Sequence, residues 1–136
     1  MDGCFVIAEA GVNHNGELDL AIDLVDAAVE AGADAVKFQV FQADLLLTDS
    51  APKADYQLET TNEAQSQYEM IKELELGKPD FIELASYCSK AGIEFLATPF
   101  DHQSLAFLVD ILQVKRLKVS SGDLTNAPLL LACAQS

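Results

Sequence analysis

Lysines, hydroxyls and carboxylates lie at the ends of four apolar stretches of this chain, and the lysines and hydroxyls among them suit the binding of an anion. Lys37 and Gln39 lie two residues apart within one stretch, so both point to the same side of a strand. A lysine can neutralise a phosphate or a carboxylate, and a hydroxyl can donate a hydrogen bond to it. The sequence therefore predicts a phosphate or carboxylate pocket formed by Lys37, Thr98 and Lys118. Other polar residues lie beside it at the strand ends: Glu9, Gln39, Ser121 and Asp123.

Each of these residues also has a purely structural interpretation. Lys37 could form a buried ion pair with Glu9 or Asp123, because a lysine within an apolar strand is costly to bury alone. Thr98 precedes a proline and could be a turn residue. His14 is interpreted as a loop histidine bonded to the backbone rather than as a metal ligand. The recurrence of compatible side chains at four strand ends favours a binding site over these separate explanations.

The elements that must position these side chains are predicted to alternate between strands and helices. Short apolar runs predict strands over these ranges: 4–8, 35–40, 93–97 and 117–119. Such alternation is typical of a parallel sheet, where polar groups at the carboxyl ends of the strands meet. The chain has neither a glycine-rich dinucleotide-binding motif nor a P-loop motif. The predicted class is therefore α/β, with parallel βα repeats in a barrel-type sheet.

Apolar residues spaced by three and four predict a helix after each strand. Gly77 and Pro79 are expected to break the chain before the helix that leads to the third strand. The residues expected near the starts of the four helices are Leu18, Asp80, Asp101 and Asn126.

The stretch 41–79 is long for a connection between a strand and a helix. It is interpreted as a lid or binding loop, with a disordered insertion as the alternative. Within it, Thr61 or Asn62 is predicted to cap a helix over about 63–74.

The charge of the chain excludes some classes of partner. It has 22 acidic against 8 basic residues and a formal net charge of −14. Nucleic acids and anionic membrane surfaces are bound through basic patches, so neither is expected as a partner. No stretch approaches the roughly 18 apolar residues of a membrane-spanning helix.

The three cysteines give no sign of a disulfide framework or a zinc site. Cys4, Cys88 and Cys133 are far apart in the sequence, and none forms a Cys-x-x-Cys pair. Cys88 and Cys133 lie among apolar residues and are predicted to be packing thiols. This usage fits a reducing compartment, and the expected localisation is cytoplasmic.

Several segments together resemble the N-acetylneuraminate (sialic acid) synthase family. They occur in order and extend over nearly the whole chain. The segments that carry the resemblance are Ile7–Gly16, Gly32–Gln39, Tyr56–Gln57, Gln67–Leu76, Thr98–Phe100 and Lys118–Asn126.

The resemblance implies a TIM-type (β/α)8 barrel, of which residues 1–136 would form about four βα units, followed in the family by a small antifreeze-like domain. It implies the condensation of phosphoenolpyruvate with an N-acetylated aminosugar, which yields a nonulosonic acid and phosphate. A divalent ion, Mn or Mg, assists in the family, and its ligands are expected outside this chain, so no metal ligand is assigned here.

The resemblance also implies roles for the candidate residues. Lys37, Thr98, Lys118 and Ser121 would hold the phosphate and carboxylate of phosphoenolpyruvate, while the sugar would meet Gln39 and Asp123. Many family members carry Glu where this chain has Asp123. The residues expected to be catalytic are Glu9, Lys37 and Lys118.

The half barrel and the resemblance lead to further expectations. The chain is expected to be an incomplete form that is inactive alone. A homodimer is expected from the resemblance, and the unpaired edges of a half sheet favour pairing of two chains. The alternatives for function are another phosphoenolpyruvate-dependent barrel aldolase and a non-catalytic anion-binding or interaction module.

Overall fold

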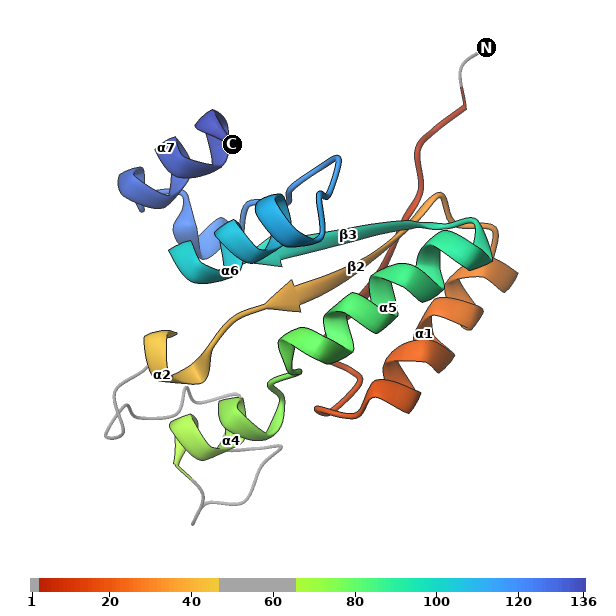
Figure 1. Cartoon of the computed structure of the whole chain (residues 1–136), viewed down its shortest axis with the longest axis horizontal. Helices are drawn as coiled ribbons and strands as arrows, with labels where there is room; N and C mark the ends of the chain where they lie inside the picture. Colours follow the sequence, from red (N-terminus) through yellow and green to blue (C-terminus); the bar gives the residue numbers. More distant parts are fainter. Residues whose placement is uncertain (1–2, 47–65) are drawn as a thin grey trace.

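Three parallel strands form the centre of the computed structural model, which describes residues 3–46 and 66–136 (Figure 1). The strands are β1 (Ile7–Gly11), β2 (Ala35–Val40) and β3 (Glu94–Pro99), hydrogen-bonded in that order. Both pairs are parallel, with Glu9 beside Lys37 and Gln39 beside Thr98. The predicted α/β class with a parallel sheet is confirmed.

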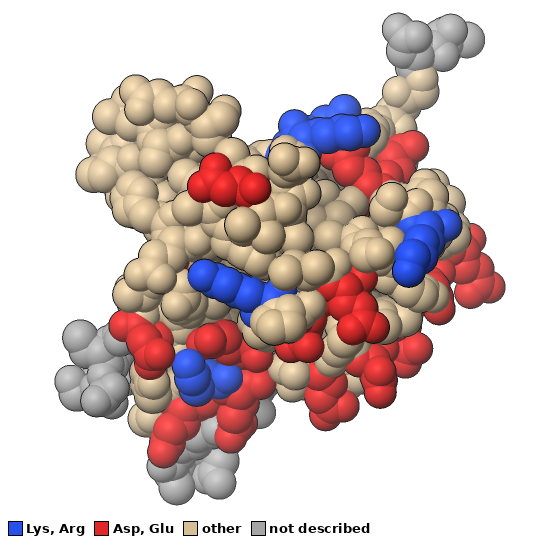
Figure 2. Space-filling view, viewed as in Figure 1, with Lys and Arg blue, Asp and Glu red and all other residues tan. Residues whose placement is uncertain are grey.

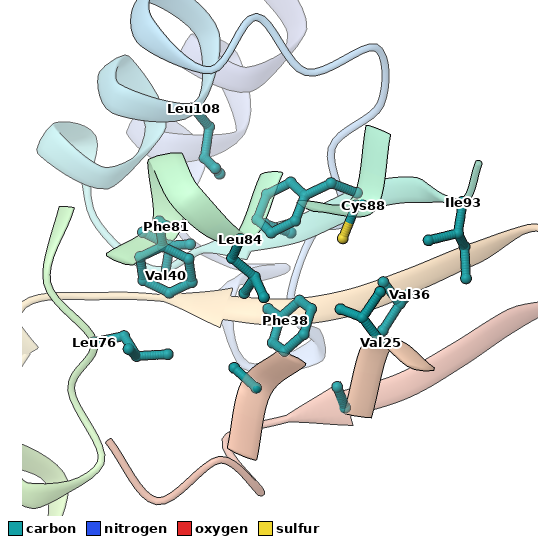
Figure 3. Close-up of a cluster of buried hydrophobic side chains, with 14 of the residues drawn as sticks. Val25, Val36, Phe38, Val40, Leu76, Phe81, Leu84, Cys88, Ile93 and Leu108 are labelled. Atoms are coloured by element: carbon teal, nitrogen blue, oxygen red, sulfur yellow. The ribbon is translucent and has the colours of Figure 1, made fainter. Parts of the chain in front are cut away.

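The helices α1 (Leu18–Glu30) and α5 (Lys78–Ala91) lie side by side on one face of this sheet (Figure 1). Their apolar residues pack on alternate strand residues in a single core (Figure 3). Burial of such side chains is the main stabilising contribution, about 1.5–3 kcal/mol for each large one. Core residues include Val25, Val36, Phe38, Val40, Phe81, Leu84, Cys88 and Phe95.

The first strand begins later than predicted. The prediction placed it over 4–8, whereas β1 is Ile7–Gly11. Ile7 pairs with Ala35, the first residue of β2, so the residues before it extend past the end of the neighbouring strand. An apolar run alone does not fix which part of it has a partner.

Two short helices lie in the described parts of the long second connection. They are α2 (Ala43–Leu46), which was not predicted, and α4 (Gln67–Glu73). Ser66 caps α4 through a reciprocal capping box with Glu69. The caps predicted at Thr61 and Asn62 lie outside the described residues.

An ionic cluster joins α2 to α4. Lys72 pairs with Asp44 and Glu75, and Glu75 accepts a hydrogen bond of 2.9 Å from the Ala43 backbone. Tyr68 donates to Asp44, and this hydrogen bond, with the Lys72 charge, lowers the pKa of the carboxyl.

The start of α5 corrects the expectation that Gly77 and Pro79 break the chain before a helix at Asp80. The helix begins at Lys78, with Gly77 as N-cap and Pro79 in the first turn. Proline is tolerated there because its missing N–H has no partner in the helix anyway. The Gly77 N–H donates to Asp80 Oδ2 over 3.1 Å.

The fourth predicted strand, 117–119, is reduced to one bridge between Leu117 and Ala97. It follows α6 (His102–Ala106) and a π-helical turn (Phe107–Ile111), and no strand flanks its other side within the described residues. A strand with so little pairing gains few ladder hydrogen bonds.

The chain continues through a 3-10 turn (Ser121–Asp123) into α7 (Ala127–Gln135). The predicted caps are confirmed, because Asp101 accepts from Ser104 N and Asn126 from Leu129 N. Within the described parts of the chain, no helix is long and apolar enough to span a membrane.

Candidate functional site

Four of the predicted site residues lie together on the sheet face opposite α1 and α5. Register places Glu9 next to Lys37 and Gln39 next to Thr98, and directly paired residues of parallel strands point to the same face. The intervening residues Val36, Phe38 and Val40 belong to the core. The predicted alternation along β2, with Lys37 and Gln39 opposite the apolar residues, is therefore confirmed.

Lys37 is buried and paired. It is 8% exposed, and its Nζ forms an ion pair with Glu9 Oε2. The structural interpretation of Lys37 as half of an ion pair with Glu9 is thus correct, while Asp123 is not its partner. An ammonium group has three donors, so pairing with one carboxylate oxygen leaves capacity for a second anion. The Glu9 side chain is 52% exposed.

Gly11 allows the side chains of Glu9 and Gln39 to approach the backbone of β1. Its φ is +59°, where glycine is favoured, and the pairing of β1 with β2 is irregular between Glu9 and Gly11. A Cβ at this position would lie 3.2 Å from Glu9 Oε1 and 3.6 Å from Gln39 Nε2. The carboxylate and the amide therefore converge above Gly11, which the sequence analysis did not single out.

Thr98 supplies a buried hydroxyl without a partner. The residue is 2% exposed, and its Oγ1 makes no hydrogen bond within the described structure. Thr98 lies inside β3, so the interpretation as a turn residue is wrong. An unpaired buried hydroxyl costs about 1–3 kcal/mol. Such a group is well placed to donate to a ligand oxygen.

The fourth predicted strand end lies next to these four residues but is held by fewer contacts. The Lys118 N–H donates to the Ala97 carbonyl over 3.1 Å, which places the segment beside β3. Lys118 and Ser121 are exposed, and Asp123 accepts a 3.3 Å hydrogen bond from Asn126 Nδ2. In the described part of the chain, the Lys118 ammonium group has no ion-pair partner. The structure thus brings four predicted residues together and leaves the other three on a neighbouring segment.

Arg116 lies on the same face of the sheet, and it was not among the predicted site residues. It forms an ion pair with Glu94 and lies 4.6 Å from the centre of the Phe5 ring. Glu94 pairs with Ala35 at the start of the strands, away from Thr98. The spacing of two between Arg116 and Lys118 would have predicted their common side.

His14 is fully buried in the loop after β1. Its Nδ1 accepts a 3.0 Å hydrogen bond from Gly16 N, which confirms its interpretation as a backbone-bonded histidine. Its Nε2 has no partner among the described residues, and burial lowers the pKa of the imidazole. A Cβ on Gly16 would lie 2.3 Å from the Glu73 carbonyl, so the loop packs closely on the end of α4.

The cysteines and acids offer no metal site in the described residues. No group of three or more His, Cys, Asp and Glu side chains there could hold a metal ion. Cys88 is buried as predicted, and burial raises its thiol pKa to about 12, which keeps it protonated. Cys133 is half-buried, and burial and the Asp123 charge raise its pKa.

Comparison with known proteins gives consistent results. A family model described as the NeuB family matches residues 24–136. An N,N'-diacetyllegionaminic acid synthase of Legionella pneumophila is 55% identical over 131 residues, which are 96% of this chain and 36% of that protein. The N-acetylneuraminate-9-phosphate synthase of Mus musculus is 35% identical over 127 residues, covering 93% of this chain and 35% of the relative.

A solved structure agrees with these matches. The sialic acid synthetase of Leptospira borgpetersenii, crystallised in complex with citrate, superposes with a TM-score of 0.79 at 36% identity. The match covers 98% of this chain and 42% of that one. The chain spans little more than a third of the length of the curated relatives that it matches.

Proposed function

Because the chain belongs to the NeuB family, we propose that its strand ends bind phosphoenolpyruvate for condensation with an N-acetylated aminosugar. The products of this reaction are a nonulosonic acid and phosphate. Its relatives include an N,N'-diacetyllegionaminic acid synthase and an N-acetylneuraminate-9-phosphate synthase, which supports this class of chemistry.

One observation carries the proposal: the buried Lys37 and the unpartnered Thr98 hydroxyl lie on the same sheet face. Lys37 keeps donors beyond the one that meets Glu9, and Thr98 Oγ1 lacks a partner within the described residues. Both groups can therefore donate a hydrogen bond to a phosphate or carboxylate oxygen without breaking an existing one. This is the chemistry that a small dianion or trianion requires.

In the proposed reaction, the residues at the strand ends hold phosphoenolpyruvate against the aldehyde. Lys37 and Lys118 neutralise its phosphate and carboxylate, and Thr98 and Ser121 donate hydroxyl hydrogen bonds. Fixing the reactants in this way removes much of the entropic barrier to carbon–carbon bond formation. The methylene carbon attacks the aldehyde carbon, water adds to the neighbouring carbon, and phosphate leaves.

Gln39, Asp123 and Glu9 act on the sugar side of the pocket. Gln39 can donate and accept hydrogen bonds from sugar hydroxyl or amide groups, and Asp123 can accept them. Glu9 pairs with Lys37 through Oε2, and its half-exposed carboxylate can accept hydrogen bonds from the sugar. The 55% identity to a diacetyllegionaminic acid synthase favours a di-N-acetylated aminosugar as the substrate to test first.

A divalent ion would polarise the aldehyde in this chemistry. The described residues do not present a set of ligands for one. We therefore assign no metal ligand in this chain, and the residue roles above stand without one.

The test is an assay of phosphate release from phosphoenolpyruvate by the protein expressed from its complete reading frame. Di-N-acetylated and mono-N-acetylated aminosugars are compared, with Mn²⁺ or Mg²⁺ supplied. Lys37→Ala and Lys118→Ala are each expected to raise the required phosphoenolpyruvate concentration sharply, whereas Lys90→Ala, an exposed lysine of α5, is the matched control. Unchanged kinetics in both site variants would refute the pocket.

The two alternative functions are separated by the same assay. Another phosphoenolpyruvate-dependent aldolase would release phosphate with sugars that lack an N-acetyl group. A non-catalytic anion-binding module would bind phosphoenolpyruvate in a calorimetric titration and release no phosphate with any sugar.

A further inference from the structure

Gly11 lies beneath two side chains that the proposed reaction assigns to the sugar, those of Glu9 and Gln39. Because Gly11 has no side chain, the carboxylate and the amide can both approach the place where a Cβ would stand. We infer that Gly11 is a positioning residue for sugar binding, and that its missing Cβ keeps these two groups together as one acceptor and one donor. The inference rests on the proposed function and extends it to a residue that has no polar side chain of its own.

The backbone conformation alone does not explain a glycine at this position. Gly11 has a φ of +59°, in the left-handed region that glycine adopts freely. Two residues with side chains adopt nearly the same φ in this chain, Asn15 at 51° and Gln113 at 52°. A side chain at Gly11 is therefore opposed by the groups above it as well as by the φ of the backbone.

The tighter of the two contacts above Gly11 is with Glu9. A Cβ would lie 3.2 Å from Glu9 Oε1, which is closer than nearly all Cβ contacts in proteins, and 3.6 Å from Gln39 Nε2, which is an ordinary contact. The other carboxylate oxygen, Glu9 Oε2, is held by the ion pair with the buried Lys37. A side chain at Gly11 would therefore tilt the carboxylate about this ion pair and change its position relative to the Gln39 amide.

Glu9 Oε1 and Gln39 Nε2 are complementary in hydrogen bonding. The carboxylate oxygen accepts hydrogen bonds, and the amide nitrogen donates them. Both atoms lie within 3.6 Å of one point, the place of the missing Cβ. A sugar hydroxyl can donate to the first atom and accept from the second at the same time, so one hydroxyl group of the substrate can satisfy both. Moving the carboxylate away from this arrangement would weaken the pair of hydrogen bonds.

Gly32 provides a matched control for Gly11. It follows α1 with a φ of +73°, and a Cβ there would meet no atom within 4 Å, so a substitution brings the backbone strain without the contact. Gly32 precedes β2, at the opposite end of that strand from Gln39. Figure 2 shows that acidic side chains dominate the surface over α1 and α5, which does not suit an anionic substrate. Substitution of Gly32 should therefore leave the binding of both substrates unchanged.

The test uses the protein expressed from its complete reading frame and measures phosphate release at varied concentrations of each substrate. The variants are Gly11→Ala, Gly11→Asn, Gly32→Ala and Gly32→Asn, and circular dichroism verifies the fold of each. Both Gly11 variants should raise the KM for the aminosugar at least about tenfold and the KM for phosphoenolpyruvate less than about threefold, since Lys37 and Thr98 remain buried between paired strands. The Gly32 variants should leave both KM values within about twofold of the wild type.

Asparagine separates the contact from the backbone strain. Asparagine adopts positive φ more readily than alanine does, as Asn15 shows in this chain. Gly11→Asn therefore strains the backbone less than Gly11→Ala but fills more of the space beneath the carboxylate. If the contact governs sugar binding, Gly11→Asn has the larger effect on the KM for the aminosugar. A smaller effect than that of Gly11→Ala, or equal changes in the Gly32 variants, would overturn the inference.

A readout that needs no turnover keeps the inference separate from the proposed function. The side-chain amide of Gln39 and the carboxylate carbon of Glu9 are followed by NMR in selectively labelled protein. Both resonances should shift in the Gly11 variants and stay in place in the Gly32 variants. A wild type that releases no phosphate would refute the proposed function, while the resonances would still decide the role of Gly11. Unshifted resonances of both groups in the Gly11 variants would overturn the inference.

Discussion

The sheet β1–β3 and the segment from Val114 to Ser136 both carry residues of the proposed site but differ in how firmly they are held. In the sheet, Lys37 and Thr98 are buried between paired strands and above a continuous core. In the later segment, Lys118 and Ser121 are exposed, and one bridge joins the segment to β3. In the proposed anion site, the sheet therefore provides a preformed half of buried side chains, and the later segment adds exposed ones.

The largest expected difference between the two regions is in stability. Leu84→Ala should lower the free energy of unfolding by about 2–5 kcal/mol, because Leu84 is fully buried in the core under the sheet. Leu124→Ala should lower it by less than about 0.5 kcal/mol, since Leu124 is 65% exposed. Urea denaturation measures both. Equal losses would show that the later segment is packed as firmly as the sheet.

Substitution of the sheet lysine should likewise have a larger effect than substitution of the lysine in the later segment, here on ligand binding. In the 136-residue chain, Lys37→Ala is expected to weaken phosphoenolpyruvate binding about 10- to 100-fold, the value of one charge-assisted hydrogen bond in a buried site. Lys118→Ala is expected to weaken it less, about three- to tenfold, because its ammonium group is solvated. Calorimetric titration measures both affinities, with Lys90→Ala as control. A larger loss of affinity for Lys118→Ala than for Lys37→Ala would show that the later segment, rather than the sheet, provides the preformed half of the proposed site.

The hydroxyls allow a sharper contrast, because one variant should gain stability while it loses binding. Thr98→Val removes a buried hydroxyl without a partner in the described structure and should stabilise the fold by about 1 kcal/mol. It should also weaken binding of phosphoenolpyruvate. Ser121→Ala, at an exposed position, should leave stability unchanged. A destabilised Thr98→Val variant would indicate that the hydroxyl already has a partner.

The smallest expected effect concerns pH and the loop after β1. Burial lowers the pKa of His14 in the folded state, so below about pH 6.5 the unfolded chain binds more protons than the folded one. Stability from this residue is therefore present above that pH and is lost as pH falls through it. His14→Gln should flatten the pH dependence of the urea midpoint between pH 7 and 5, while His102→Gln, at an exposed position, should not. Identical curves for all three proteins would contradict this account.

The sequence was sufficient for the sheet and for the residues that it positions. Alternation along β2 predicted that Lys37 and Gln39 oppose the apolar residues, and the strand order brought Thr98 beside Gln39. These features depend on local periodicity and on the general rule that parallel strands deliver their carboxyl ends to one edge of the sheet.

The parts that could not be predicted depend on contacts between distant segments. A fourth strand was predicted over 117–119, but this segment forms only one bridge, because an apolar run does not reveal whether a neighbouring strand exists on both sides. The complete burial of His14 depends on the packing of its loop against Phe38, 6.2 Å away between ring centres. The convergence of Glu9 and Gln39 above Gly11 depends on a local irregularity of β1 that has no periodic signature.

Amide hydrogen exchange with and without phosphoenolpyruvate tests most directly whether both regions hold one ligand. The amides of β2 and β3 should exchange slowly in both conditions, because they lie in paired strands above the core. Those from Lys118 to Asp123 should exchange quickly in the free chain and gain protection when the ligand is added. Protection that appears elsewhere, or no change in this segment at saturating ligand, would contradict a shared anion site.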